Sequence, residues 1–103
     1  MNCLPNEIAL STKVTSRFSQ IKQKVGISPN IMARIAILKA LEQNEEPSNL
    51  DQPESLQQKI PKDVAFGDYQ DFFDFGIQEY INSHSYSGDI KELVTCLIET
   101  GSS

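Results

Sequence analysis

The stretch Leu4–Leu41, LPNEIALSTKVTSRFSQIKQKVGISPNIMARIAILKAL, decides the fold of this 103-residue chain. It joins a basic amphipathic segment to an almost wholly apolar one through the junction Gly-Ile-Ser-Pro-Asn. Residues 1–40 carry six bases against one acid, a net charge of +5, whereas residues 41–103 carry three lysines against thirteen acids, a net charge of −10. This asymmetry predicts a cationic working surface within an acidic protein.

A strand and a helix are predicted on the amino side of the junction. Residues 6–10 partly alternate, which allows a brief strand, and Ser11 or Thr12 then caps a helix. Gly26 ends that helix in the C′ position. Apolar residues recur within the helix at spacings of four, three and four and form a single stripe: Val14, Phe18, Ile21 and Val25.

A second helix is predicted after the junction. Ser28 is its N-cap and Pro29 its first residue, and it runs to about Gln43. Because this helix is apolar on nearly every side, it must be covered on most of its surface. We therefore expect it to be the core element and to pack partly against another subunit, with an interface that includes Ile31, Ile35 and Leu38.

The remaining chain is predicted to be polar at first and then helical. The segment 44–62 is a polar surface connection, in which Pro53–Lys59 forms a short helix or is mobile. A third helix spans about Asp68–Ser83, and a fourth runs from near Ser87 to Gly101. The third helix directs six apolar residues towards the core: Phe66, Tyr69, Phe73, Ile77, Tyr80 and Ile81.

The fold class that follows is mainly α. We expect one small domain, 1–103, of about four helices with a short N-terminal strand, assembling as a homo-oligomer because so short a chain buries limited surface by itself. Its parts are a basic strand-helix-helix part (1–43), the polar connection (44–62) and an acidic helical part (63–103).

Three bases form a ridge on the first helix. Lys13, Arg17 and Lys24 fall within about 40° of one another at 100° per residue. The ridge suits phosphate contacts along a nucleic-acid backbone, but a solvated helix face explains it equally well, and both alternatives stay open. Lys22 lies on the opposite flank and can extend its ammonium to water.

Two further candidates lie at and after the junction. The helix start at Ser28 and Asn30 offers free N–H groups to a phosphate, although ordinary capping also accounts for it. Arg34 projects from an apolar helix and needs a partner, for which a carboxylate is the first expectation and a phosphate the second.

No catalytic constellation is recognisable, so the sequence predicts a protein that is not an enzyme and uses no metal or cofactor. Asp68, Asp71 and Asp74 fit the charged outer face of a helix, and His84 has no nucleophile partner. The two cysteines are expected to be free thiols. The chain lacks an apolar run that could span a bilayer and a signal peptide, which predicts a cytoplasmic protein.

The first two-fifths of the chain resembles DndE, the small subunit of the bacterial DNA sulfur modification (phosphorothioation) system, which is associated with restriction-modification. The matching residues are Leu4-Pro5-Asn6, Ile8, Leu10-Ser11, Phe18, Ile21-Lys22, Gly26-Ile27-Ser28-Pro29-Asn30-Ile31 and Arg34-Ile35-Ala36. The resemblance implies a non-catalytic, DNA-binding accessory subunit that forms a homotetramer, prefers nicked double-stranded DNA and associates with DndC and DndD. Its expected DNA-binding residues are Lys13, Arg17, Lys22, Lys24, Ser28, Asn30 and Arg34.

The amino half also resembles ribbon-helix-helix DNA-binding proteins. That likeness implies a strand that pairs between two subunits, with Glu7 and Ala9 facing outwards, a set poorly suited to reading base edges. Two alternatives to the DNA-binding subunit therefore remain: a scaffold module of the same complex that does not bind DNA itself, and a ribbon-helix-helix transcriptional regulator.

Overall fold

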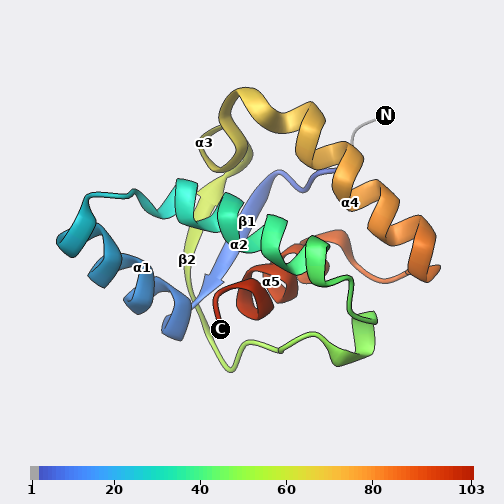
Figure 1. Ribbon diagram of the computed structural model, residues 1–103, viewed down its shortest axis with the longest axis horizontal. Coiled ribbons are helices and arrows are strands. Elements are labelled where there is room, and N and C mark those ends of the chain that lie inside the picture. The colour runs from blue at the N-terminus through green and yellow to red at the C-terminus, as the bar shows by residue number, and fades with distance from the viewer. Residues whose placement is uncertain (1–2) are drawn as a thin grey trace.

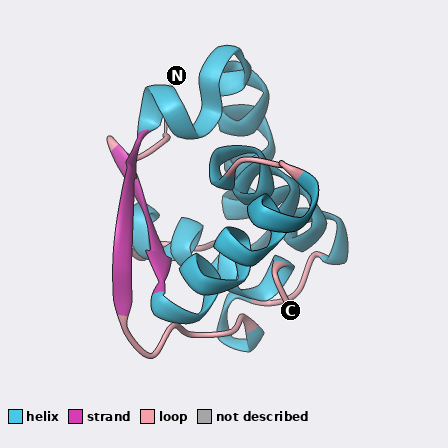
Figure 2. Ribbon diagram, turned by 90° about the vertical axis from the view of Figure 1, so that its left-hand side faces the viewer, coloured by secondary structure: helices cyan, strands magenta, loops and turns pink. Residues whose placement is uncertain are grey.

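The computed structural model describes residues 3–103, and most of that chain is helical, as predicted. The helices lie on one side of a small two-stranded sheet (Figures 1 and 2). The elements, in order, are β1 (Glu7–Ser11), α1 (Thr12–Val25), α2 (Pro29–Gln43), η1 (Pro47–Asn49), β2 (Leu56–Pro61), α3 (Lys62–Phe66), η2 (Gly67–Tyr69), α4 (Gln70–His84) and α5 (Ile90–Gly101).

The ends of α1 and α2 follow from local chemistry. Ser11 caps α1 by accepting a hydrogen bond from the Val14 N–H at 3.0 Å. Gly26 ends α1 with a φ of 77°, a left-handed conformation that glycine adopts without a Cβ clash. Ser28 and Pro29 begin α2, which ends at Gln43. These predicted boundaries are confirmed.

The helix α5 is the most deeply buried element. It packs against α2 on one side and β1 on the other, and its side chains from Leu93 to Glu99 are all buried. A Cβ added at Gly101 would lie only 1.8 Å from the Ala36 carbonyl oxygen, so the two backbones nearly touch. The core therefore centres on α5 rather than on α2, which was the expected core element.

The buried side of α2 consists mainly of small residues: Ala33, Ala36, Ile37 and Ala40. These residues allow the close approach of α5. The larger Ile31, Ile35 and Leu38 lie on the opposite side and are exposed to 43%, 48% and 41%. The helix thus places its small residues inside and leaves its large apolar residues uncovered within the described chain.

The polar connection contains a strand that the sequence did not reveal. Strand β2 pairs antiparallel with β1, with Ile8 opposite Ile60 and Ala9 opposite Lys59. The expectation of a short helix or mobile segment at Pro53–Lys59 is therefore wrong. Only Ile60 of β2 is buried, so the strand has almost no apolar pattern of its own and is specified by its distant partner.

This pairing also corrects two expectations from the ribbon-helix-helix likeness. The order strand, helix, helix is present, but β1 pairs within the chain rather than between subunits. Ala9 is only 1% exposed instead of facing outwards. A strand enclosed in this way presents little surface to a DNA groove.

The third predicted helix begins slightly later than expected and is preceded by two short helical turns. Its residues Phe73, Ile77 and Tyr80 are buried, as is Phe66 before it. Tyr69 was expected in the core but is 57% exposed, because it ends the tight turn η2 and does not share the buried face of α4.

Candidate nucleic-acid interface

The predicted basic ridge is exposed along α1. Lys13, Arg17 and Lys24 are all solvent-accessible. The Arg17 guanidinium donates to the Ser102 carbonyl oxygen beyond the end of α5, where a cation also complements the helix dipole. Lys13 lines a surface hollow together with acidic residues, so the surroundings of the ridge are not purely cationic. Those residues are Asp51, Glu54 and Glu99.

Ion pairing leaves most bases of the amino half available. Within residues 3–103, the salt bridges join Glu7 to Lys59 and Lys91 and Glu46 to His84. A hydrogen bond from Lys91 is the main cause that holds the pKa of Glu7 below its usual value. None of these bridges involves a base of α1 or α2, although Arg17, Arg34 and Lys39 donate to backbone carbonyl oxygens.

Lys22 lies on the other flank of α1, as predicted, and faces β2. It lines a hollow of about 510 Å³ that also includes Lys59. Sequence reasoning missed Lys59 because the strand that carries it was not recognised.

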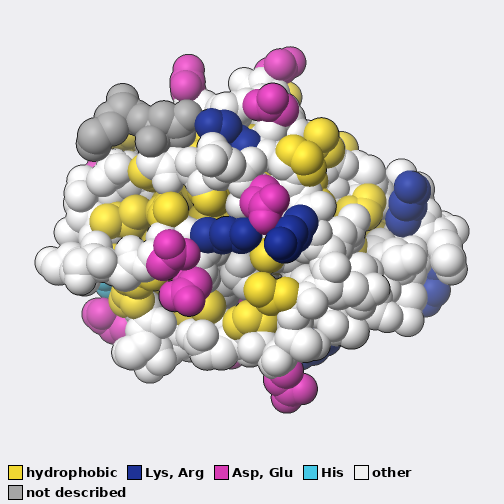
Figure 3. Space-filling view, turned by 180° about the vertical axis from the view of Figure 1, so that it is seen from behind, with side chains coloured by type: hydrophobic (Ala, Val, Ile, Leu, Met, Phe, Trp, Pro, Cys, Tyr) yellow, Lys and Arg dark blue, Asp and Glu magenta, His cyan; other side chains and the backbone are white. Residues whose placement is uncertain are grey.

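Figure 3 shows the side of the molecule opposite to Figure 1. Basic and acidic side chains mix at the centre of this face, whereas the end formed by α1 carries basic side chains without acidic ones in this view.

The start of α2 is not capped by its own serine. The Ser28 hydroxyl hydrogen-bonds the Asn30 side-chain oxygen instead of a backbone N–H. The Asn30 amide nitrogen donates to the Val64 carbonyl oxygen at 3.2 Å. The positive end of the α2 dipole is thus left without a side-chain cap, while Asn30 is occupied by α3.

Arg34 satisfies its guanidinium with backbone oxygens. Nε donates to the Ala65 carbonyl at 2.7 Å, Nη2 donates to the Val64 carbonyl at 3.3 Å, and the group lies 5.6 Å from the centre of the Tyr69 ring. Within residues 3–103 no carboxylate pairs with it, because the end of α3 supplies backbone acceptors at the required place. A Cβ at Gly67 would lie 2.8 Å from Nη2, so this glycine makes room for the arginine.

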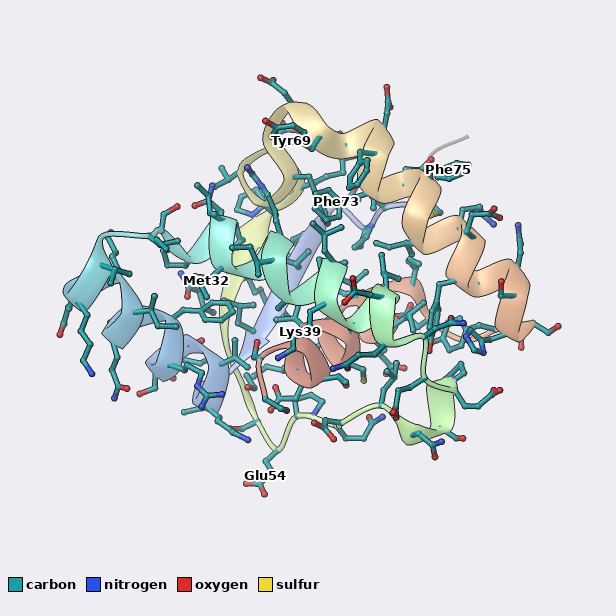
Figure 4. All side chains as sticks on the ribbon, in the orientation of Figure 1. Met32, Lys39, Glu54, Tyr69, Phe73 and Phe75 are labelled. Atoms are coloured by element: carbon teal, nitrogen blue, oxygen red, sulfur yellow. The ribbon has the colours of Figure 1, made fainter. Side chains whose placement is uncertain are left out.

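Of the predicted oligomer residues Ile31, Ile35 and Leu38, Leu38 lies beside the exposed aromatic side chains of η2 and α4. A mostly apolar hollow of about 340 Å³ opens where Leu38 and Arg34 meet Tyr69, Phe72 and Phe73. Phe73 points towards α2, whereas Phe75 points away from it (Figure 4). The surface around α2 therefore has the apolar character expected of a contact with another protein.

Other chemistry is sparse in the described chain. Residues 3–103 contain no group of three or more metal-ligating side chains in a suitable arrangement, and no helix among them is long and apolar enough to cross a membrane. Both cysteines are free thiols. Burial, followed by the hydrogen bond with Asp74, raises the pKa of the Cys3 thiol to about 12, so it stays protonated at neutral pH.

A comparison with protein families identifies the chain. The family described as "DNA sulphur modification protein DndE" matches residues 7–101, nearly the whole length. The chain belongs to the DndE family. The match extends through α5, whereas the resemblance that the sequence alone suggested was confined to β1, α1 and α2.

Two solved DndE structures share the fold. The crystal structure of DndE from Escherichia coli B7A, involved in DNA phosphorothioation modification, has 23% sequence identity and a TM-score of 0.75, and the match covers 95% of each chain. A DndE mutant involved in DNA phosphorothioation has 22% identity and a TM-score of 0.70, with 95% of this chain and 94% of that chain covered. No curated protein matches the sequence.

Proposed function

We propose that this DndE-family chain is a non-catalytic accessory subunit of DNA phosphorothioate modification that binds duplex DNA through backbone phosphates. The observation that carries the proposal is the family match together with a basic amino half whose cations form no ion pair within residues 3–103. Cations without carboxylate partners can release counterions from DNA on binding. Burial of β1 argues against base readout by that strand.

The contacts are proposed to come from Lys13, Arg17, Lys22, Lys24, Ser28 and Asn30. Arg34 belongs to the same proposed set through its charge, although its hydrogen bonds to α3 give it a structural task as well. The chain would act in the cytoplasm as a homotetramer, prefer nicked duplex and associate with DndC and DndD. Ile31, Ile35 and Leu38 would lie in the contact between copies.

Neutralising the ridge tests the proposal. The triple variant Lys13→Gln, Arg17→Gln, Lys24→Gln should retain its circular dichroism spectrum and lose most of its affinity for a labelled duplex at low salt. The matched control removes three lysines elsewhere, with the changes Lys39→Gln, Lys62→Gln and Lys91→Gln. Equal losses in both variants would indicate a net-charge effect and would count against the ridge as the contact surface.

A second candidate function is a scaffold of the same complex that does not bind DNA itself. It is favoured by the exposed aromatic side chains of the acidic carboxyl half, because Tyr69, Phe72 and Phe75 are exposed to 57%, 59% and 68%. Replacing Phe72 and Phe75 by Ser should then abolish capture of DndC or DndD. Retained capture together with intact DNA binding would remove this alternative.

A further inference from the structure

The hollow between α1 and β2 has the lining of an anion site. It has a volume of about 510 Å³ and opens to solvent on the flank of α1 that lies away from the basic ridge. Its polar lining is supplied by two elements that lie far apart in the sequence: Thr15, Ser19 and Lys22 from α1, and Gln57, Gln58 and Lys59 from β2.

The three residues that α1 supplies to the hollow lie in one row along the helix. Positions 15, 19 and 22 are separated by four and three residues, so they project within about 60° of one another on a regular helix. The ridge of Lys13, Arg17 and Lys24 lies on the other side of the buried stripe. The helix α1 therefore presents two separate polar flanks, and only one of them faces β2.

The charge of the hollow is positive. Its lining includes two lysines and no acid. Lys22 forms no ion pair within residues 3–103. Lys59 lies 3.7 Å from the Glu7 carboxylate, but the same oxygen accepts a shorter bond of 2.6 Å from Lys91, so one carboxylate is shared by two ammonium groups. The lysine that faces the hollow is thus only partly neutralised.

Several donors in the hollow lack acceptors. The Thr15 hydroxyl oxygen is buried and has no hydrogen-bond partner in the described chain. Within residues 3–103, the side chains of Ser19, Gln57 and Gln58 also form no hydrogen bond, although each can donate. The donors at the mouth of the hollow that are open to solvent, those of Ser19 and Gln57, can therefore donate to an acceptor that enters from outside.

We propose that this hollow binds a phosphate group of a nucleic-acid backbone, held by Lys22 and Lys59 and by the hydroxyl and amide donors between them. The inference rests on the proposed DNA binding and adds a second contact surface to the ridge. Pro29, the first residue of α2, also lines the hollow, so the uncapped positive end of that helix lies at its edge. The hollow beside Lys13 is lined by acids that compete for cations, whereas the hollow between α1 and β2 has no acid among its described lining residues.

Duplex titration of the full chain at several salt concentrations tests the proposal. For the double variant Lys22→Gln, Lys59→Gln, the slope of log K against log salt should become shallower by about 1, because both lysines hold the same phosphate. The matched double variant Lys39→Gln, Lys62→Gln has the same net charge and should keep the wild-type slope. Ser19→Ala, which removes only an exposed hydroxyl of the lining, should weaken binding roughly 3- to 10-fold without changing the slope.

Titration with inorganic phosphate distinguishes a failure of this phosphate site from a failure of the proposed function. In ¹H–¹⁵N NMR spectra, phosphate should shift the amides of Thr15, Ser19 and Lys22 in the wild type and not in the double variant Lys22→Gln, Lys59→Gln. Duplex binding with an unchanged slope in that variant would overturn the hollow as a phosphate site, together with the Lys22 contact, and would spare DNA binding through the basic ridge. Phosphate shifts without duplex binding would overturn the proposed function and assign the hollow to another phosphate-bearing ligand. If neither the phosphate shifts nor duplex binding is observed, both the phosphate site in the hollow and the proposed function are overturned.

Discussion

Gly101 sets how closely α5 can approach α2. A methyl group at this position would overlap the Ala36 carbonyl oxygen, whose distance from the added Cβ would be 1.8 Å, so the helices would have to separate. We expect Gly101→Ala to lower the free energy of unfolding by about 1–3 kcal/mol, as overpacking usually does. Urea denaturation measures the change.

Gly76 provides the matched control for that substitution. It also lies within a helix, but its added Cβ would meet only the flexible end of Leu41, at 3.2 Å. Gly76→Ala should be neutral or stabilising, because alanine favours a helix by about 1 kcal/mol over glycine. A neutral Gly101→Ala variant would contradict the close helix contact.

Arg34 is expected to matter more for stability than for DNA affinity. Its Nε and Nη2 groups join α2 to the end of α3 through two carbonyl oxygens. Arg34→Gln should lower the free energy of unfolding by about 1–2 kcal/mol, the scale of charged hydrogen bonds that are partly exposed. Thermal denaturation and duplex titration of one preparation measure both effects. A large loss of affinity with unchanged stability would assign Arg34 to phosphate contact alone.

Glu7 connects three secondary-structure elements. It lies on β1 and pairs with Lys59 of β2 and Lys91 of α5. Because the Lys91 hydrogen bond lowers the pKa of Glu7 in the folded protein, its contribution to stability is present above the ordinary value of 4.5 and is lost as pH falls through the lower folded value.

Acid denaturation should therefore weaken the contact between the sheet and α5. The wild type should lose stability as the pH is lowered below about 4.5, and Glu7→Gln should lose less over the same range because it has no carboxylate to protonate. Urea midpoints at pH 3, 4 and 6 measure the difference. Identical pH profiles for the two proteins would show that the Glu7 bridges do not contribute.

The elements differ in how far local sequence specifies them. The ends of α1 and α2 could be predicted because Ser11, Gly26 and the Ser28-Pro29 pair are local signals that act over a few residues. Strand β2 could not be predicted, since its pairing with β1 is a long-range contact and only Ile60 marks its buried side.

The candidate site was predictable to the same extent. The basic ridge follows from helical spacing alone, so the sequence reveals it. The hollow forms only where α1 and β2 lie side by side, and no local signal in the sequence links Lys59 to Lys22. The partners of Arg34 were likewise hidden, because the carbonyl oxygens of α3 become available only when that turn packs on α2.

In the assembled molecule, the exposed apolar side of α2 should govern self-association. Ile35 and Leu38 are uncovered although both are large and apolar, a pattern typical of a contact with another chain. We expect the wild type to associate through this side and the double variant Ile35→Glu, Leu38→Glu to be monomeric, since buried unpaired carboxylates oppose association. Light scattering after gel filtration measures the mass. A wild-type monomer, or an unchanged variant oligomer, would contradict this interface.

Salt dependence is the most direct test of the proposed binding of DNA through its phosphates. A labelled duplex with a single nick and its intact counterpart would be titrated by fluorescence anisotropy at 50 and 200 mM salt. We expect binding to both duplexes that weakens steeply with salt, because counterion release drives it, and tighter binding to the nicked form. Absence of binding at the lower salt concentration, or an affinity that does not change with salt, would contradict it.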